Sequence, residues 1–397
     1  MSTGFYFLFI NMKVRNLFND FFNSEKASGL ILIGCTVISL LLANSRFESQ
    51  YFEILHYNFS GESVSHWIND GLMAIFFLLV GLELEREVYI GELSSLKKAM
   101  LPAIAALGGM FVPALFHLLF NYGTPTQGGA GIPMATDIAF ALAVLSLVGN
   151  RIPNSLRIFL TALAVIDDLG AILVIAIFYT GSLHWFNLLT AFSIFGVLLI
   201  FNRLKVRNVV PYLLGGVVMW YFMLHSGIHA TVAGVLVAFA IPFGNGDEKS
   251  TSYLLQHYLH KPVAFVILPL FALANTAVKL PDEWVHSLVE ANSLGIFTGL
   301  FFGKPLGIFL FSYCSSMLNI TRLPSDLKWS QIIGAGFLGG IGFTMSIFIT
   351  LLAFDDNHFI DESKIVILIT SVAAGAVGFC LLRIFTRSHK KSGVPEL

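Results

Sequence analysis

The chain is dominated by long apolar runs that recur from residue 27 to residue 384. A transmembrane α-helix needs about 20 mostly apolar residues to cross a hydrocarbon core of about 30 Å. Twelve such runs can be marked, and the connections between them are short. They cover residues 27–44, 66–84, 99–120, 134–149, 155–179, 185–201, 209–224, 227–243, 262–278, 293–313, 330–353 and 365–384. The pattern predicts an all-α polytopic membrane protein with about twelve transmembrane helices.

The composition excludes several classes of soluble protein. Charged residues make up only 12 % of the 397 residues and hydrophobic residues 56 %, whereas about 25 % charge is usual. A disordered chain is more polar, and a nucleic-acid-binding protein carries a basic excess, whereas the net charge here is −1. We therefore expect a lipid bilayer, and no nucleic acid, as partner. The three cysteines lack metal-binding spacing and are expected to be small buried hydrophobes: Cys35, Cys314 and Cys380.

Three segments are expected along the chain. Residues 1–26 are predicted to form an N-terminal interfacial segment, because residues 14–22 have the pattern of a short amphipathic helix. The apolar stretch before them is too short to span and is followed by no cleavage site, so we expect no signal peptide. Residues 27–384 form the transmembrane domain, and residues 385–397 form a tail.

Basic residues mark the two sides of the membrane. Nineteen of the 23 Lys and Arg fall in loops on one side, three fall on the other, and the last, Lys304, lies inside the run 293–313. Because Lys and Arg concentrate in cytoplasmic loops, the distribution predicts that both termini are cytoplasmic.

Three aspartates share the membrane interior with Lys304. Asp137 lies in the run 134–149, and Asp167 and Asp168 lie in the middle of the run 155–179. Each ionisable group at the bilayer centre opposes insertion by roughly 2.5–3.5 kcal/mol. One Asp–Lys pair would suffice as a structural ion pair that fixes helix packing. Three carboxylates against one lysine leave an excess of negative charge, which indicates a site for a cation or a proton.

The adjacent aspartates cannot both serve the same neighbour. Successive residues point about 100° apart on a helix, so one of Asp167 and Asp168 can contact a lysine while the other binds an ion. Oxygen ligands suit hard cations such as Na⁺, and interacting carboxylates titrate as a coupled unit. Competition between protons and a cation for such a site couples their exchange if the site opens to one side at a time.

Two glycine-rich segments, 123–131 and 334–342, accompany the fourth and eleventh spans. Glycine weakens a helix and permits unwound backbone beside a cavity, although small residues also serve close helix packing. The two spans lie seven apart, as a repeat of spans 3–5 onto spans 10–12 requires. Paired interrupted helices mark the site of transporters built from inverted repeats. We therefore expect inverted repeats with interrupted helices 4 and 11.

Seven strings in order between residues 67 and 349 carry a family resemblance: WINDGLMAIFFLLVGLELERE, MATDIAFALAVLSL, LTALAVIDDLGAI, SGIHATVAGV, LPLFALAN, FGKPLGI and GGIGFTMSIFI. In these strings the chain resembles the NhaA family of sodium/proton antiporters. The resemblance implies electrogenic exchange of Na⁺ or Li⁺ for more than one proton by alternating access, with activity that rises at alkaline pH. It further implies a multi-pass protein of the bacterial inner membrane that is not an enzyme and uses no cofactor.

The resemblance also implies roles for the buried charges. Asp168 matches the principal Na⁺- or Li⁺-binding carboxylate and Asp167 its partner, and Thr136 and Asp137 match positions beside the ion. Asp137 and Lys304 match residues that compensate the dipoles of the half-helices where these cross. Lys304 either carries a proton or is a structural partner that neutralises Asp167, and the sequence leaves both alternatives open.

Five further residues match positions linked to pH response and ion access: Glu83, Arg86, Glu87, His229 and His257. The first three would equally suit a solvated helix end, and His229 would equally suit a packing residue. The chain departs from the family pattern near His257, because Gln256 stands where an acidic residue is usual and Tyr253 and Leu254 stand where a basic pair is usual. The loop 50–66 looks shorter than the family's dimer-forming hairpin, although a small hairpin fits around Ser60 and Gly61. A homodimer is therefore an expectation from the resemblance alone.

Three other classes of membrane protein fit part of the pattern. Another sodium-coupled secondary transporter, such as a symporter of an organic solute, would need a roomy polar pocket. An intramembrane aspartyl protease would need two facing aspartates, for which Asp137 and Asp168 qualify, but no GxGD string occurs. A channel would lack a fixed exchange ratio.

Overall fold

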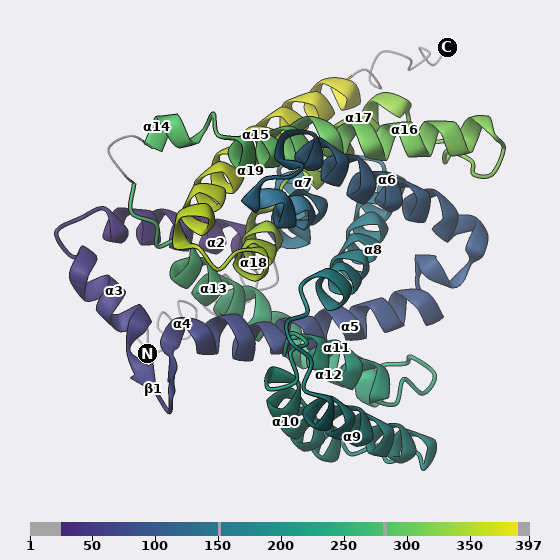
Figure 1. Ribbon diagram of the computed structural model, residues 1–397. Coiled ribbons are helices and arrows are strands. Elements are labelled where there is room, and N and C mark those ends of the chain that lie inside the picture. The colour runs from purple at the N-terminus through teal and green to yellow at the C-terminus, as the bar shows by residue number, and fades with distance from the viewer. Residues whose placement is uncertain (1–24, 150–151, 281–283, 388–397) are drawn as a thin grey trace, which may run out of the picture.

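The computed structural model describes residues 25–149, 152–280 and 284–387. This part of the chain is almost entirely helical (Figure 1). Nearly all of the predicted interfacial segment 1–26, and most of the predicted tail 385–397, lie outside the described residues.

The helices follow one another with short connections. In chain order they are α2 (Glu25–Ala43), α3 (Glu48–His56), α4 (Val64–His66), η1 (Trp67–Leu72), α5 (Met73–Tyr89), η2 (Glu92–Ser94), α6 (Leu96–Asn121), η3 (Pro125–Met134), α7 (Ile138–Val148), α8 (Asn154–Phe178), α9 (Trp185–Arg203), α10 (Val210–Leu224), α11 (Val232–Ala240), α12 (Thr251–Pro262), η4 (Val263–Ile267), α13 (Leu268–Asn275), α14 (Trp284–Ser287), α15 (Ala291–Thr298), η5 (Gly299–Gly303), α16 (Lys304–Met317), α17 (Trp329–Gly339), α18 (Phe343–Ala353) and α19 (Asn357–Arg387).

Seven of the described helical segments are long and apolar enough to cross a membrane, and up to ten if each bent pair of helices is one span. Every predicted apolar run overlaps a helix or a helix pair, but two of them form short helices. The run 209–224 coincides with the 15 residues of α10, and the run 227–243 contains only the nine residues of α11. The fold is therefore that of an α-helical, multi-pass membrane protein, and the number of twelve crossings stays a prediction.

The fourth and eleventh spans are both interrupted, as predicted. The axes of η3 and α7 meet at 43° around residues 135–137, and those of α17 and α18 meet at 49° around residues 340–342. The two breaks bond to each other, because the Asp137 amide donates to the Ile341 carbonyl at 2.7 Å and the Ser346 hydroxyl donates to the Ile132 carbonyl at 2.7 Å. Backbone groups freed from one helix are thus satisfied by the other, as unwound backbone at membrane depth requires.

Two apolar cores organise the bundle. The larger core joins α2, α5, α6, α7, α8, α13 and α15–α19, and it includes residues at the two breaks. The smaller core is formed by α9, α10 and α11 with the adjoining face of α5. Helix α5 contributes Phe77 to the first core and Leu82 to the second, so it connects the α9–α10 hairpin to the rest of the molecule (Figure 1).

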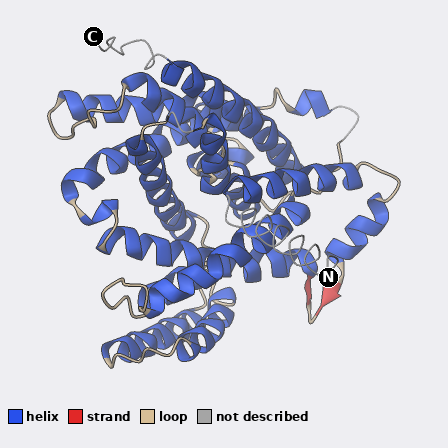
Figure 2. Cartoon of the chain, turned by 180° about the vertical axis from the view of Figure 1, so that it is seen from behind, coloured by secondary structure: helices blue, strands red, loops and turns tan. Residues whose placement is uncertain are grey.

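A short hairpin follows α3. Strands β1 (Asn58–Phe59) and β2 (Glu62–Ser63) pair antiparallel and form the one sheet among the described residues (Figure 2). The two turn residues, Ser60 and Gly61, have φ angles of 57° and 99°, as a type I′ turn needs. The predicted small hairpin is confirmed, and the homodimer stays a prediction.

The expectation that the cysteines are buried was wrong for two of the three. Cys35 is half-buried, whereas Cys314 and Cys380 are exposed on α16 and α19. Lipid tails are as apolar as a protein core, so an apolar residue on a spanning helix can face outward without a free-energy penalty. Apolar sequence context therefore did not determine burial.

Helices α6 and α16 approach closely at two glycines. A Cβ atom added at Gly108 would lie 2.3 Å from the Gly307 carbonyl oxygen, and one added at Gly307 would lie 2.1 Å from the Gly108 carbonyl oxygen. Small residues allow this approach, and the contact fixes the helix that begins with Lys304.

We predict that Gly307→Ala lowers stability by about 1–3 kcal/mol, because backbone atoms rather than a movable side chain occupy the space the methyl group needs. Thermal unfolding of the purified protein in detergent measures this as a lower Tm. Gly196→Ala on α9 is the matched control, because no atom lies within 4 Å of the added Cβ there. An equal Tm for Gly307→Ala and Gly196→Ala contradicts the prediction.

Candidate functional site

A fully buried ion pair lies where the interrupted helices meet. Lys304 and Asp167 have no exposed surface, and the Lys304 Nζ lies 2.7 Å from the Asp167 Oδ2. Lys304 is the first residue of α16 and directly follows the π-helical turn η5, a helix type often found at functional sites. Its ammonium also donates to the carbonyl of Met134, the last residue of η3. The lysine therefore joins α8 to the end of the first half-helix.

Thr136 lies in the break between η3 and α7 and connects the same groups. Its Oγ1 lies 2.7 Å from the Asp167 Oδ2 and 3.0 Å from the carbonyl oxygen of Gly339, the last residue of α17. The single hydroxyl proton can serve one of these acceptors at a time. The Asp167 carboxylate and the Gly339 carbonyl therefore compete for this one proton.

Asp137 caps both half-helices that begin at the crossing. Its Oδ1 accepts the Phe140 amide of α7 at 2.9 Å, and its Oδ2 accepts the amide and hydroxyl of Thr344 on α18 at 3.2 and 2.6 Å. A carboxylate is favoured at a helix N-terminus by the unpaired amides and the helix dipole. Asp137 faces two N-termini while Lys304 faces a C-terminus, so each charge opposes the helix dipole beside it.

Asp168 differs from its neighbours in lacking a partner. Its side chain is 2 % exposed, and its Oδ1 has no hydrogen-bond partner among the described residues. The Oδ1 of Asp167 is likewise buried without a partner. A carboxylate removed from water without compensation is strongly disfavoured. An ionised Asp168 would therefore carry an uncompensated buried charge, and the Oδ1 atoms of Asp167 and Asp168 are both without a hydrogen-bond partner among the described residues.

A cavity of about 520 Å³ with several charged residues in its wall lies beside this cluster, and the buried Asp and Lys side chains do not themselves line it. Its inner wall contains Ile138 and Ala139, which follow Asp137, and Val165, one helical turn before Asp168. Its outer wall carries Glu83, Arg86, Glu87, Gln256 and His257. The Arg86 guanidinium lies over the Tyr253 ring at 5.2 Å from its centroid, and the His260 ring nitrogen lies 3.8 Å from Glu83.

The structure separates His229 from the other residues that match pH-response positions. It lies before α11, where its Nε2 is 3.4 Å from the Asp70 Oδ1. The other Asp70 oxygen lies 3.1 Å from the His66 Nε2. Asp70 is in η1, at the opposite end of the α4–η1–α5 segment from Glu83. His229 also contacts the Phe348 ring edge-on, so it combines a packing contact with an acidic partner.

Sequence reasoning missed several groups around the cluster. Thr344 bonds to Asp137, and the carbonyls of Met134 and Gly339 accept from Lys304 and Thr136. Thr344 lies two residues after the glycine run 334–342, and this position beside a predicted break was the available signal. Glu85 is also buried, at 6 % exposure, and accepts a hydrogen bond of 3.3 Å from the Ser252 hydroxyl. The residues predicted from the sequence include its neighbours Glu83, Arg86 and Glu87 but not Glu85.

Comparison of the sequence with known proteins matches the chain to one family. A family model described as Na⁺/H⁺ antiporter 1 matches residues 19–382. A protein of Flavobacterium psychrophilum named Na(+)/H(+) antiporter NhaA is 65 % identical over 94 % of this chain and 97 % of its own length. The protein of that name from Cytophaga hutchinsonii is 59 % identical over 97 % of this chain and all of its own length. The chain therefore belongs to the Na⁺/H⁺ antiporter 1 family.

Proposed function

We propose that this protein exchanges Na⁺ for protons across a membrane, with Asp168 as the principal cation ligand. The observation that carries the proposal is the unpartnered, buried Asp168 carboxylate beside the Asp167–Lys304 ion pair. The relatives of 65 % and 59 % identity, which are named Na(+)/H(+) antiporters, support the same activity.

Exchange follows from competition for the carboxylate oxygens. Asp168 holds a proton when none of the transported cation is bound. When it loses that proton, its oxygens and the free Oδ1 of Asp167 bind Na⁺ or Li⁺, hard cations that prefer oxygen ligands. Thr136 lies on the other oxygen of Asp167 and orients it. Release of the cation on the opposite side leaves the carboxylates free to take up protons again.

We infer from the cavity the side of the membrane from which ions reach the site. The cavity rim carries residues that the charge distribution assigns to the cytoplasmic side, which supports access to the site from the cytoplasm in this conformation. We place both termini in the cytoplasm of a bacterial cell, with twelve crossings of the inner membrane. Inverted repeats of spans 3–5 and 10–12 would rock about the two breaks to expose the site outward. We further propose that the protein forms a homodimer and uses no cofactor.

The rim residues are proposed to control ion access and its pH dependence. Glu83, Arg86, Glu87 and His257 line one cavity, so a change in charge at any of them acts on cations that approach Asp168. His229 would act separately through Asp70. Gln256 contributes no charge at a rim position where the family usually places an acid, so the alkaline activation of this chain is expected to differ from the family pattern.

We predict that Asp168→Asn abolishes Na⁺-dependent and Li⁺-dependent proton flux, because the amide cannot exchange a proton for a cation. The measurement uses inverted membrane vesicles acidified by respiration, in which added Na⁺ dissipates the pH gradient reported by a fluorescent dye. Asp167→Asn removes the flux in the same way. Asp137→Ala weakens it, because the substitution uncaps α7 and α18 at about 1 kcal/mol each. Scanned over pH, the assay also reports alkaline activation.

Asp326→Asn is the matched control, because Asp326 is exposed in the loop before α17 and should leave the flux unchanged. Normal exchange by Asp168→Asn would contradict the site assignment. Na⁺ flux that an organic solute stimulates, without loss of the pH gradient, would favour a sodium-coupled symporter instead.

We further propose that Lys304 carries one of the exchanged protons. The ammonium occupies the Asp167 Oδ2, so a cation that binds to the adjacent carboxylate oxygens competes with it for the same negative charge. Release of the lysine proton resolves this competition. Lys304 would then add a proton to the stoichiometry and make exchange electrogenic.

Lys304→Ala is predicted to retain exchange but with one proton fewer, so that its rate no longer depends on membrane voltage. Proteoliposomes with a voltage set by a potassium gradient and valinomycin provide the measurement. The wild-type rate should change with voltage under the same conditions. Voltage-dependent exchange by the active Lys304→Ala variant would assign the lysine a structural role only, as the neutralising partner of Asp167.

A further inference from the structure

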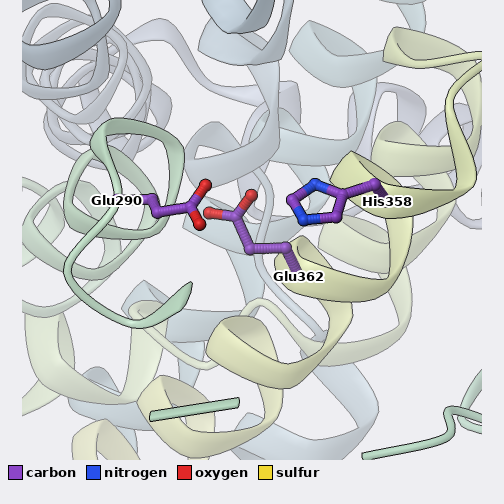
Figure 3. Close-up of side chains that lie close together, drawn as sticks. All are labelled: Glu290, His358 and Glu362. Carbon is purple, nitrogen blue, oxygen red and sulfur yellow. The ribbon is translucent and has the colours of Figure 1, made fainter. Parts of the chain in front are cut away.

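A second cluster of ionisable side chains lies outside the proposed transport site. Glu290 immediately precedes α15, and His358 and Glu362 lie one helical turn apart near the start of α19. Figure 3 shows the Glu362 carboxylate between that of Glu290 and the His358 ring, with all three groups directed toward one another. Their nearest ligand atoms all lie within 4.8 Å of one another.

Glu362 has two oxygens with different surroundings. The side chain is only 3 % exposed. Its Oε1 accepts the backbone amide of Ser293 at 3.0 Å and the Ser293 hydroxyl at 2.5 Å, so it caps the N-terminus of α15. Its Oε2 is buried without a hydrogen-bond partner among the described residues. Capping of α15 therefore accounts for the hydrogen bonds of Oε1 only. Oε2, beside Glu290 and His358, is left without a partner.

The charge of this cluster is not neutralised by its basic neighbour on α19. The Lys364 ammonium lies 3.9 Å from Asp361, and the structure pairs no described Lys or Arg with Glu290 or Glu362. Two carboxylates so close together repel each other, and one of them is buried. A bound cation would relieve the repulsion and engage the free Oε2.

We propose that Glu290, His358 and Glu362 bind one divalent transition-metal cation, for which Zn²⁺ is the best fit. One imidazole nitrogen and two carboxylate oxygens are ligands that Zn²⁺ accepts, at about 2.0–2.2 Å each, with a remaining position for water. In a tetrahedral site two ligands at those lengths lie about 3.3–3.6 Å apart, so rotation of the exposed Glu290 and His358 side chains has to bring together ligand atoms that now lie within 4.8 Å. The imidazole distinguishes it from an all-oxygen site for Na⁺.

The bound ion would connect two parts of the bundle. Glu290 is the residue immediately before α15, and α19 packs against α15, α17 and α18. A cation shared by Glu290 and α19 therefore fixes the N-terminal end of α15 relative to α19, and it stabilises the folded state in proportion to its binding. This inference does not depend on the exchange activity.

Zn²⁺ binding to the full-length protein in detergent, after removal of metal with a chelator, tests the proposal by titration calorimetry. We predict one Zn²⁺ per chain with an affinity in the micromolar range or tighter, a Tm that rises with Zn²⁺, and weaker binding of Mg²⁺ and Ca²⁺. Glu290→Gln and His358→Gln should each weaken Zn²⁺ binding by about 10–100-fold, since even supporting groups of metal sites contribute that much. Both side chains are exposed, so the variants should fold.

Glu362→Gln separates the metal site from the helix cap, because the glutamine oxygen still accepts from Ser293 while the charge is lost. The matched control is Glu53→Gln with His56→Gln, an exposed Glu/His pair on α3 without a buried third carboxylate. Zn²⁺ binding should be lost in Glu362→Gln and unchanged in the control. Absence of Zn²⁺ binding by the wild type, or equal affinities for wild type and His358→Gln, would overturn the proposal.

Discussion

The rest of the structure depends on one constraint. Buried charges, and backbone groups freed where helices are interrupted, must find hydrogen-bond or ionic partners within the protein because no water is available there. Two helices are interrupted inside the bundle, which leaves amides and carbonyls without partners in their own helices. Asp137 accepts from both helix starts, and Lys304 and Thr136 donate to the ends of η3 and α17. At membrane depth every such group must be satisfied within the protein. The buried charges and the broken helices therefore stabilise each other, and neither would be tolerated alone.

This mutual compensation leaves Asp168 as the remaining charge. Asp137 is occupied by amides and a hydroxyl, and Asp167 by Lys304 and Thr136, whereas the Oδ1 of Asp168 has no partner among the described residues. A fully compensated cluster would be a structural support with no reason to bind anything. Because one carboxylate is in excess, either a proton or a cation can occupy its oxygens, but not both at once. This competition is the physical basis of coupled exchange.

The proposed metal site at the start of α19 uses the same principle in a different chemical form. Glu362 caps α15 with one oxygen and leaves the other free, as Asp167 pairs with Lys304 through one oxygen and leaves its Oδ1 free. The ligand sets differ, because His358 adds an imidazole nitrogen that is absent from the Asp167–Asp168 cluster. The two clusters should therefore select different cations, a hard monovalent ion in one and a transition metal in the other.

The sequence by itself determined the class of protein, the positions of the helices, the two interruptions and the identity of the buried charges. Those features depend on local composition: apolar runs form spanning helices, glycine runs break them, and a charge within an apolar run is buried with its helix. Only the tertiary structure decided which partner each charge has. It paired Lys304 with Asp167, which the residues alone left open and only the resemblance named, brought Thr344 to Asp137, and separated His229 from the cavity rim. Contacts between residues more than 100 positions apart depend on how the helices cross, and no local pattern records that crossing. The same reason explains the exposed Cys314 and Cys380, because the side of a helix that faces lipid is as apolar as the side that faces its neighbours.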